Sequence, residues 1–298
     1  MCRFCLAPEV SINFPTKTVV IAFLFLATGA LAQMGGSSST SSGSGSAGRT
    51  IGRDTSPLNP ENSLEIIKPP VPAEEMAYKT FQKFQAMSNK DLAKKIQAGE
   101  DFLKKYPSTS YSTPVYSFLT TAYIQTGAVD KCLAAGEKDL QLNPRDFWTM
   151  AVMSQAISRT VTATTPDSAT QLTKADSYGK NAIQGIAALA KPEGMSDANF
   201  TELKQQTLAM ASGSLGLVQV RKNEFEAAIP ELEQAVALGS NEDPTNYYLL
   251  GVANQNAGHF EKAVVAFEKC AAVRGNLQGT CTTGAEQSKK EAAQRSPK

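Results

Sequence analysis

The chain has 298 residues, a formal net charge of +1 and a hydrophobic content of 42%, enough apolar sequence for one or two globular domains. This near-neutral charge gives no general reason to expect nucleic acid as a partner. There is one histidine, so a metal centre built from several imidazoles is excluded. Catalysis by a histidine relay would rest on His259 alone. The composition therefore favours a binding or structural protein over an enzyme, and we expect no cofactor and no metal.

Residues 1–32 have the pattern of a cleavable signal peptide. Lys17 precedes an apolar run that ends in the small residues of Ala30-Leu31-Ala32, and the run is shorter than the roughly 20 residues that a membrane span needs. An uncleaved membrane anchor is the alternative. We predict cleavage after Ala32, an exported chain that begins at Gln33, and no transmembrane segment after cleavage. The predicted location is the periplasm or cell envelope, with secretion as a further possibility.

Residues 33–73 form a linker rich in Ser, Gly and Pro. Such sequence has few apolar side chains to offset the entropy of ordering, so we predict that it is disordered. The glycines within it match a dinucleotide-binding pattern, but neither a strand nor a helix flanks them, and the match is assigned to low complexity.

From residue 74 the apolar positions follow a helical period, and no convincing alternating strand is found. The main observation is an offset of 35 residues, at which similar residues recur. The matched pairs include Leu215 with Leu250, Gly216 with Gly251, Phe225 with Phe260, and Ala228 with Ala263. One helical pair cannot bury such a face alone, whereas a stacked copy can, so the offset predicts a helical-repeat protein.

This pattern resembles the tetratricopeptide repeat. The resemblance is closest at Tyr247, Leu250, Gly251, Gly258, Phe260, Ala263 and Phe267. Weaker copies include Tyr116, Leu119, Tyr123 and Gly127, and the residues around Met150 and Met153. The resemblance implies an all-α, right-handed α-solenoid of about four helical hairpins over residues 74–275, followed by a C-terminal turn, helix and polar tail at 276–298.

The middle of the predicted array departs from the repeat. An insertion lies near Thr160–Asp167, and two helices at 168–190 and 197–221 are longer than a repeat requires, with Ser196 as the N-cap of the second. The extra turns either project beyond the solenoid as an extended central hairpin or cover the insertion. The sequence leaves these two alternatives open.

Three cysteines remain after the predicted cleavage. Because export places them in an oxidising compartment, we expect a disulfide between Cys270 and Cys281 that attaches a helix at about 282–293 to the last repeat. Such a short loop contributes roughly 2–3 kcal/mol. Cys132 occupies a small-residue position that faces the partner helix, and we predict a buried free thiol.

Proteins of this repeat class bind partners along the surface formed by the first helix of each pair. The resemblance implies a protein or peptide partner. The candidate groove residues are Thr121, Gln125, Gln155, Arg159, Leu217, Arg221, Tyr248, Val252 and Asn256. The carboxylate clamp of some relatives is absent from the column at Thr121, Gln155, Leu217 and Val252, and is not carried over.

Arg159 and Arg221 occupy equivalent first-helix positions in this register and favour an extended acidic or C-terminal peptide. The alternative is that both arginines are solvated or paired within the fold. The predicted function is an exported, non-catalytic scaffold for protein–protein contacts. A structural or assembly factor of an outer-membrane or envelope complex is the second hypothesis. An enzyme is the third hypothesis, and the spacing of carboxylates does not favour it.

Overall fold

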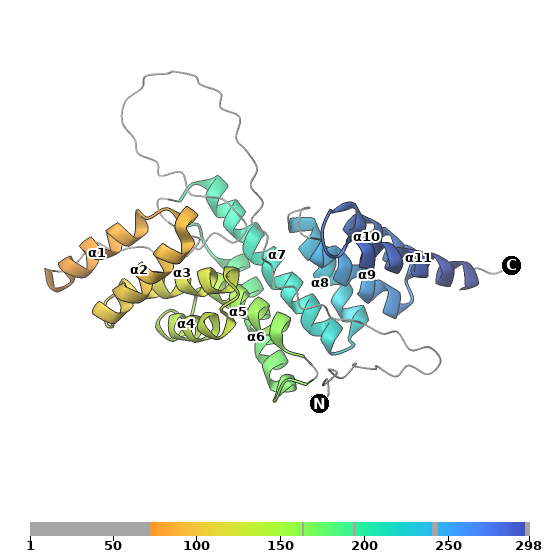
Figure 1. The fold of residues 1–298 in the computed structure, drawn as a ribbon, viewed down its shortest axis with the longest axis horizontal. Helices are drawn as coiled ribbons and strands as arrows, with labels where there is room; N and C mark the ends of the chain where they lie inside the picture. The colour runs from red at the N-terminus through yellow and green to blue at the C-terminus, as the bar shows by residue number, and fades with distance from the viewer. Residues whose placement is uncertain (1–71, 163, 193–194, 240–243, 296–298) are drawn as a thin grey trace, which may run out of the picture. The chain divides into compact units, whose positions relative to one another are not determined.

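The computed structural model describes residues 72–162, 164–192, 195–239 and 244–295. The predicted signal peptide and almost all of the predicted linker lie outside the described residues. Within the described ranges every regular element is a helix, and consecutive helices pack against one another (Figure 1). The prediction of an all-α helical-repeat fold is therefore confirmed.

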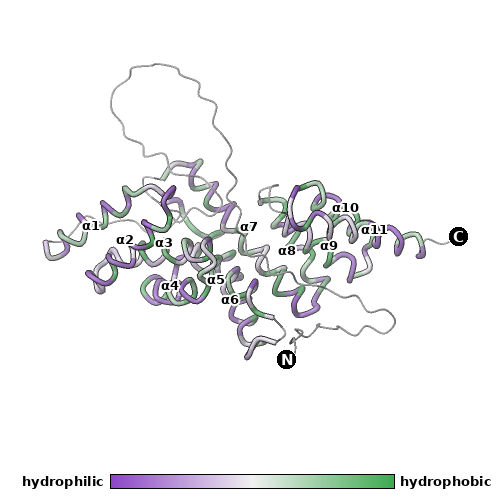
Figure 2. Tube along the Cα trace, viewed as in Figure 1, coloured by the Kyte–Doolittle hydropathy of each residue, from purple (hydrophilic) through white to green (hydrophobic). Residues whose placement is uncertain are grey.

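The helices are of similar length except in the middle and at the C-terminus. They are α1 (Glu75–Gln85), α2 (Leu92–Lys105), α3 (Ser112–Gln125), α4 (Val129–Leu142), α5 (Phe147–Thr160), α6 (Ser168–Ala188), α7 (Asp197–Arg221), α8 (Phe225–Leu238), α9 (Thr245–Ala257), α10 (Phe260–Ala272) and α11 (Gln278–Arg295). Figure 2 shows hydrophobic and hydrophilic residues alternating along these helices, as expected when one face of a helix is buried.

Short polar side chains begin several of the helices. The Asp146 carboxylate accepts a hydrogen bond from the Thr149 amide at 2.9 Å, and the Ser196 hydroxyl accepts one from the Asn199 amide at 3.1 Å, as the sequence predicted for Ser196. A short 3₁₀ turn precedes α2. Ser88 caps the short 3₁₀ turn before the helix, and Asp91 caps α2 itself.

The glycines of the repeat mark places where two helices pack closely. A Cβ atom on Gly216 would lie 2.4 Å from the Leu232 side chain, and one on Gly251 would lie 2.6 Å from the Phe267 ring. Any larger residue would push the second helix of each pair away from the first. The 35-residue spacing of these glycines therefore reflects the same contact made twice.

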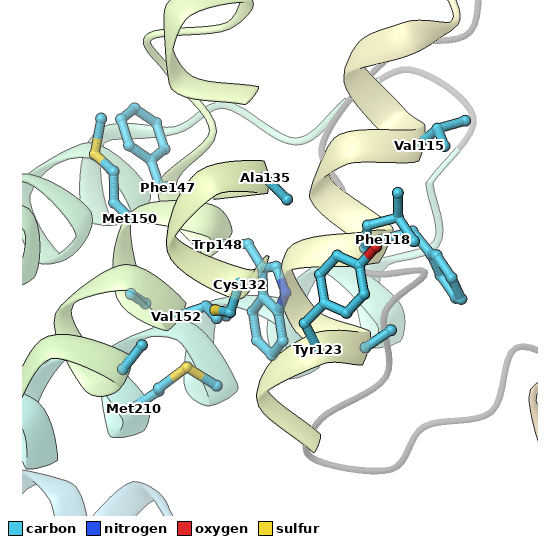
Figure 3. Close-up of a cluster of buried hydrophobic side chains, with 14 of the residues drawn as sticks. Val115, Phe118, Tyr123, Cys132, Ala135, Phe147, Trp148, Met150, Val152 and Met210 are labelled. Atoms are coloured by element: carbon cyan, nitrogen blue, oxygen red, sulfur yellow. The ribbon is translucent and has the colours of Figure 1, made fainter. Parts of the chain in front are cut away.

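The buried apolar side chains form one large cluster in the N-terminal part, a second in the C-terminal part, and a small third cluster. Figure 3 shows the centre of the first cluster, with Trp148 and Cys132 between α3, α4 and α5. Trp148 is fully buried, and so is the free thiol of Cys132, as predicted. Burial raises the pKa of the Cys132 thiol to about 12, because the thiolate would lie in apolar surroundings.

The extra turns of α6 and α7 pack against the N-terminal half of α5. Ile186 and Leu203, from the added turns, are buried in the same cluster as Phe147. Gly185 makes this possible, since a Cβ atom there would lie 2.0 Å from the Phe147 ring. Neither alternative left open by the sequence describes this arrangement, because the added turns, next to the loop between α6 and α7, are packed and cover the beginning of α5.

The insertion lies at the opposite end of α5. Val161 is buried with Leu172 of α6 and Val218 of α7 in the small third cluster. The start of α6 and the last turn of α7 therefore cover the start of the insertion, and the extra turns do not.

The predicted disulfide between Cys270 and Cys281 is present, with 5.9 Å between the two Cα atoms. The C-terminal helix is longer than expected, because α11 begins at Gln278. Cys281 therefore lies in the first turn of α11, whereas the sequence analysis placed it in the turn before the helix.

Ion pairs connect the second helices of neighbouring pairs. Lys131 of α4 pairs with Glu100 of α2 at 2.8 Å, and Lys174 of α6 pairs with Glu137 of α4. In the C-terminal part an ion pair joins two consecutive helices instead, since Lys289 of α11 pairs with Glu268 of α10 at 2.7 Å. These exposed pairs each contribute about 0–1 kcal/mol, so they help set the alignment of the helices more than their stability.

Candidate partner-binding surface

Four of the predicted groove residues lie at the C-terminal ends of the first helices, and we call them the end row. They are Gln125 of α3, Arg159 of α5, Arg221 of α7 and Asn256 of α9. The C-terminal end of a helix carries a partial negative charge, which the two arginines offset. Gln125 and Arg159 are exposed, whereas Arg221 and Asn256 are half-buried.

Arg221 is bound to the end of a neighbouring first helix. Its Nε donates a hydrogen bond to the Ser158 carbonyl at 2.7 Å, and its Nη2 donates one to the Arg159 carbonyl at 3.2 Å. The last carbonyls of a helix lack partners within the helix. After α5 the chain becomes extended at Val161, and Arg221 supplies the missing donors. Burial lowers the pKa of the Arg221 guanidinium.

The structure thus brings Arg159 and Arg221 together, but through the backbone of α5. For Arg221 it realises the alternative in which the arginine is paired within the fold. A side chain committed to two carbonyls has fewer donors left for a peptide. Arg159 keeps an exposed guanidinium beside that contact.

The predicted groove positions one helical turn before the end row are mostly buried. Leu217 and Val252 are each only 8% exposed, so they line the packed interior, and their assignment to an accessible groove is corrected. Thr121 is fully buried, and its hydroxyl accepts a hydrogen bond from the Trp148 indole at 2.9 Å. Of this column, Gln155 alone is half-buried.

Two polar contacts between first helices were not evident from the sequence. The Trp148–Thr121 bond joins α5 to α3, and a second bond joins the hydroxyls of Ser117 and Thr149 at 3.1 Å. Hydroxyl side chains at helical spacing have the same pattern whether they face solvent or a neighbour. A cluster of Ser and Thr on first helices next to a lone Trp was the available signal.

At the C-terminal end of the surface, two predicted residues are held by α9 and α10. The Asn256 amide donates to the Val252 carbonyl of its own helix at 2.8 Å. The Tyr248 ring lies 6.2 Å from the Phe267 ring, and burial raises the pKa of its hydroxyl. Tyr248 therefore acts partly as a packing residue, and its half-buried side chain retains some accessible surface.

Elsewhere the described part of the chain holds no group of three or more His, Cys, Asp or Glu side chains placed to bind a metal ion. His259 is exposed at the start of α10, where Nε2 lies 3.1 Å from a Glu226 carboxylate oxygen. That contact joins α8 to α10. Over the same described ranges, none of the helices combines the length and apolar character required to cross a bilayer.

The exposed polar groups of the surface are therefore the Gln125 amide, the Arg159 guanidinium and part of Gln155. A guanidinium donates paired hydrogen bonds to carboxylates, and an amide both donates to and accepts from a peptide backbone. This set suits binding of an extended chain segment.

Comparison with known proteins gives one match to a family model. Residues 244–276, which comprise α9, α10 and the start of the following turn, match the model described as tetratricopeptide repeat. No curated protein matches the sequence.

Solved structures with a related helical arrangement share little sequence. PilW, described as a widely conserved type IV pilus biogenesis factor, is 14% identical with a TM-score of 0.48 and covers 74% of this chain and 92% of its own. A MamA RS-1 double mutant is 14% identical with a TM-score of 0.47 and covers 75% and 98%. A thermophilic TPR protein of Thermus thermophilus is 17% identical with a TM-score of 0.44 and covers 73% and 99%. Likeness at this level indicates neither an activity nor a partner.

The packing of the helices agrees with the match at residues 244–276. The matched repeat contains Gly251 against Phe267, and the same contact recurs 35 residues earlier at Gly216. Residues 244–276 are therefore a tetratricopeptide repeat, and Gly216 shows the same helix packing one repeat earlier.

Proposed function

We propose that this protein is an exported, non-catalytic scaffold that binds a protein or peptide partner over the exposed part of the end row. The observation that carries the proposal is the exposure of Gln125 and Arg159 on neighbouring first helices, beside a closed interior. The exposed guanidinium favours a partner segment that carries carboxylates.

The partner is identified by cross-linking from the surface itself. A photoreactive residue is placed at Gln125, and a second variant carries it at Gln287, an exposed position on α11. Cross-linking in intact cells, followed by mass spectrometry, should recover a protein from position 125 that position 287 does not capture. Recovery only as part of a membrane complex would favour the assembly-factor function instead.

The role of the charge is then measured with the purified partner. Arg159→Glu should weaken binding by about tenfold or more, and the loss should be larger at low salt because exposed charges are screened by ions. Arg274→Glu, at an exposed arginine in the turn before α11, is the matched control and should leave affinity unchanged. Equal affinities for both variants would contradict binding at Arg159.

The export part of the proposal rests on residues 1–32 of the sequence. Expression in a bacterium with a periplasm, followed by N-terminal sequencing of the exported fraction, should give a chain that begins at Gln33. A chain that still begins before Lys17, or one retained in the cytoplasm, would refute this part without affecting the scaffold function.

A further inference from the structure

The C-terminal helix α11 packs along α10 with small side chains and is linked to it by one covalent bond. Its buried residues are Cys281, Ala285 and Ser288, all of them small. The other faces of the helix are polar and mostly exposed. A helix that buries so little apolar surface gains little from the hydrophobic effect. The disulfide to Cys270 is therefore a large part of its attachment.

The surface beneath α11 is strongly apolar by comparison. Phe267 of α10 is only 2% exposed, and α11 covers its ring with Gly284, where a Cβ atom would lie 2.9 Å from the ring. Ala263 and Ala266 of α10 are also buried in this cluster. If α11 moves away, the Phe267 ring loses its cover on the Gly284 side, while Gly251 of α9 still packs against it.

The remaining contacts of α11 are exposed and individually weak. Lys289 and Glu268 form an ion pair in which both side chains are more than half exposed. The Gln278 amide donates to the Ala271 carbonyl at 3.1 Å, and the Arg295 guanidinium lies 4.7 Å from the centre of the Phe260 ring. None of these contacts replaces the covalent link.

We propose that the Cys270–Cys281 disulfide is a redox latch that keeps α11 closed over the Phe267 face. A dithiol reductant attacks the S–S bond through its thiolate and forms a mixed disulfide. Its second thiol then completes the exchange. Two electrons and two protons pass to the protein, which gains two thiols, and the reductant becomes a cyclic disulfide. The reduced α11 detaches and uncovers one side of the Phe267 ring, while α9 and α10 remain folded.

The position of Cys281 provides access to the bond. Both cysteines are fully buried in the closed state. Cys281 lies in the first turn of α11, however, and residues 278–280, 282 and 283 around it are exposed. Unwinding of this one turn exposes the sulfur, so the rate of reduction should level off at high reductant concentration, where opening becomes limiting.

The test is hydrogen exchange of the full chain, read by mass spectrometry, with and without dithiothreitol. Reduction should increase the exchange rate of residues 278–295 by about tenfold or more, while α9 and α10 keep their protection. Cys281→Ser should show the same fast exchange without reductant. Thr280→Ala, in the same turn, is the control and should remain protected.

Two results would overturn the latch. Unchanged protection of α11 after complete reduction, verified by thiol titration, would show that its noncovalent contacts suffice. A parallel loss of protection in α9, α10 and α11 would show that the disulfide stabilises the last repeat as a whole. Hydrogen exchange of the fully reduced wild-type chain distinguishes these results even if Cys281→Ser does not fold.

Discussion

Arg221 provides the sharpest test of how the end row is divided between folding and binding. Replacing it with Ala removes the donors to the Ser158 and Arg159 carbonyls. Hydrogen bonds to charged groups contribute about 1.5–3 kcal/mol each in favourable surroundings. Because Arg221 is half-buried, water replaces part of that energy, and we expect Arg221→Ala to lower the free energy of unfolding by about 2–3 kcal/mol.

The assay is urea denaturation followed by far-ultraviolet circular dichroism. The midpoint should fall in Arg221→Ala while the slope stays unchanged, which indicates lost stability with the same surface exposed on unfolding. Arg159→Ala is the matched control, since its guanidinium is exposed, and it should change stability by less than about 0.5 kcal/mol. Arg221→Lys should recover only part of the loss, because an ammonium cannot present two donors in the same fork.

The outcome that refutes this reasoning is an Arg221→Ala variant as stable as the wild type. The two carbonyls would then be satisfied by water, and Arg221 would be available for a partner as the sequence first suggested. An equal loss of stability in Arg159→Ala would also contradict the reasoning. It would give a structural role to the residue that we place in the binding surface.

Three further predictions concern the interior. Thr121→Val keeps the shape of the side chain but leaves the buried Trp148 indole N–H without its acceptor, and should cost about 1–3 kcal/mol in urea denaturation. Gly185→Ala brings a Cβ atom to 2.0 Å from the Phe147 ring and should cost about 1–3 kcal/mol, seen as a lower melting temperature. For Cys132, burial raises the thiol pKa from 9.0 to about 12. The folded protein should therefore resist alkylation at about pH 8, and its stability should decline as pH rises from about 9 towards 12, because only the unfolded chain ionises freely.

The repeat could be predicted from the sequence because its signals are local and recur. Gly216 and Gly251 each meet a bulky side chain of the following helix, so the same steric requirement appears twice at a fixed offset. The Cys270–Cys281 pair was also predictable, since few cysteines remain and a short turn separates the two helices.

The candidate site was harder to predict, because side-chain partners far apart in sequence decide exposure. Arg221 and Ser158 are separated by 63 residues, and no pattern near either one indicates that they meet. Leu217 and Val252 fit the register of a groove, yet the packing of neighbouring helices buries them. The register predicts which face of a helix is shared, but the spacing between helices decides what remains accessible.

The length of α7 has a consequence for how the protein unfolds. Leu203 and Met210 lie in the N-terminal cluster, Val218 in the small cluster, and Leu217 and Val220 in the C-terminal cluster. This one continuous helix therefore contributes buried side chains to all three clusters. Arrays of independent repeats fray from their ends, unit by unit. Here, a pulling force applied to either end reaches the same helix, so the segment from α5 to α9 should rupture in one cooperative step.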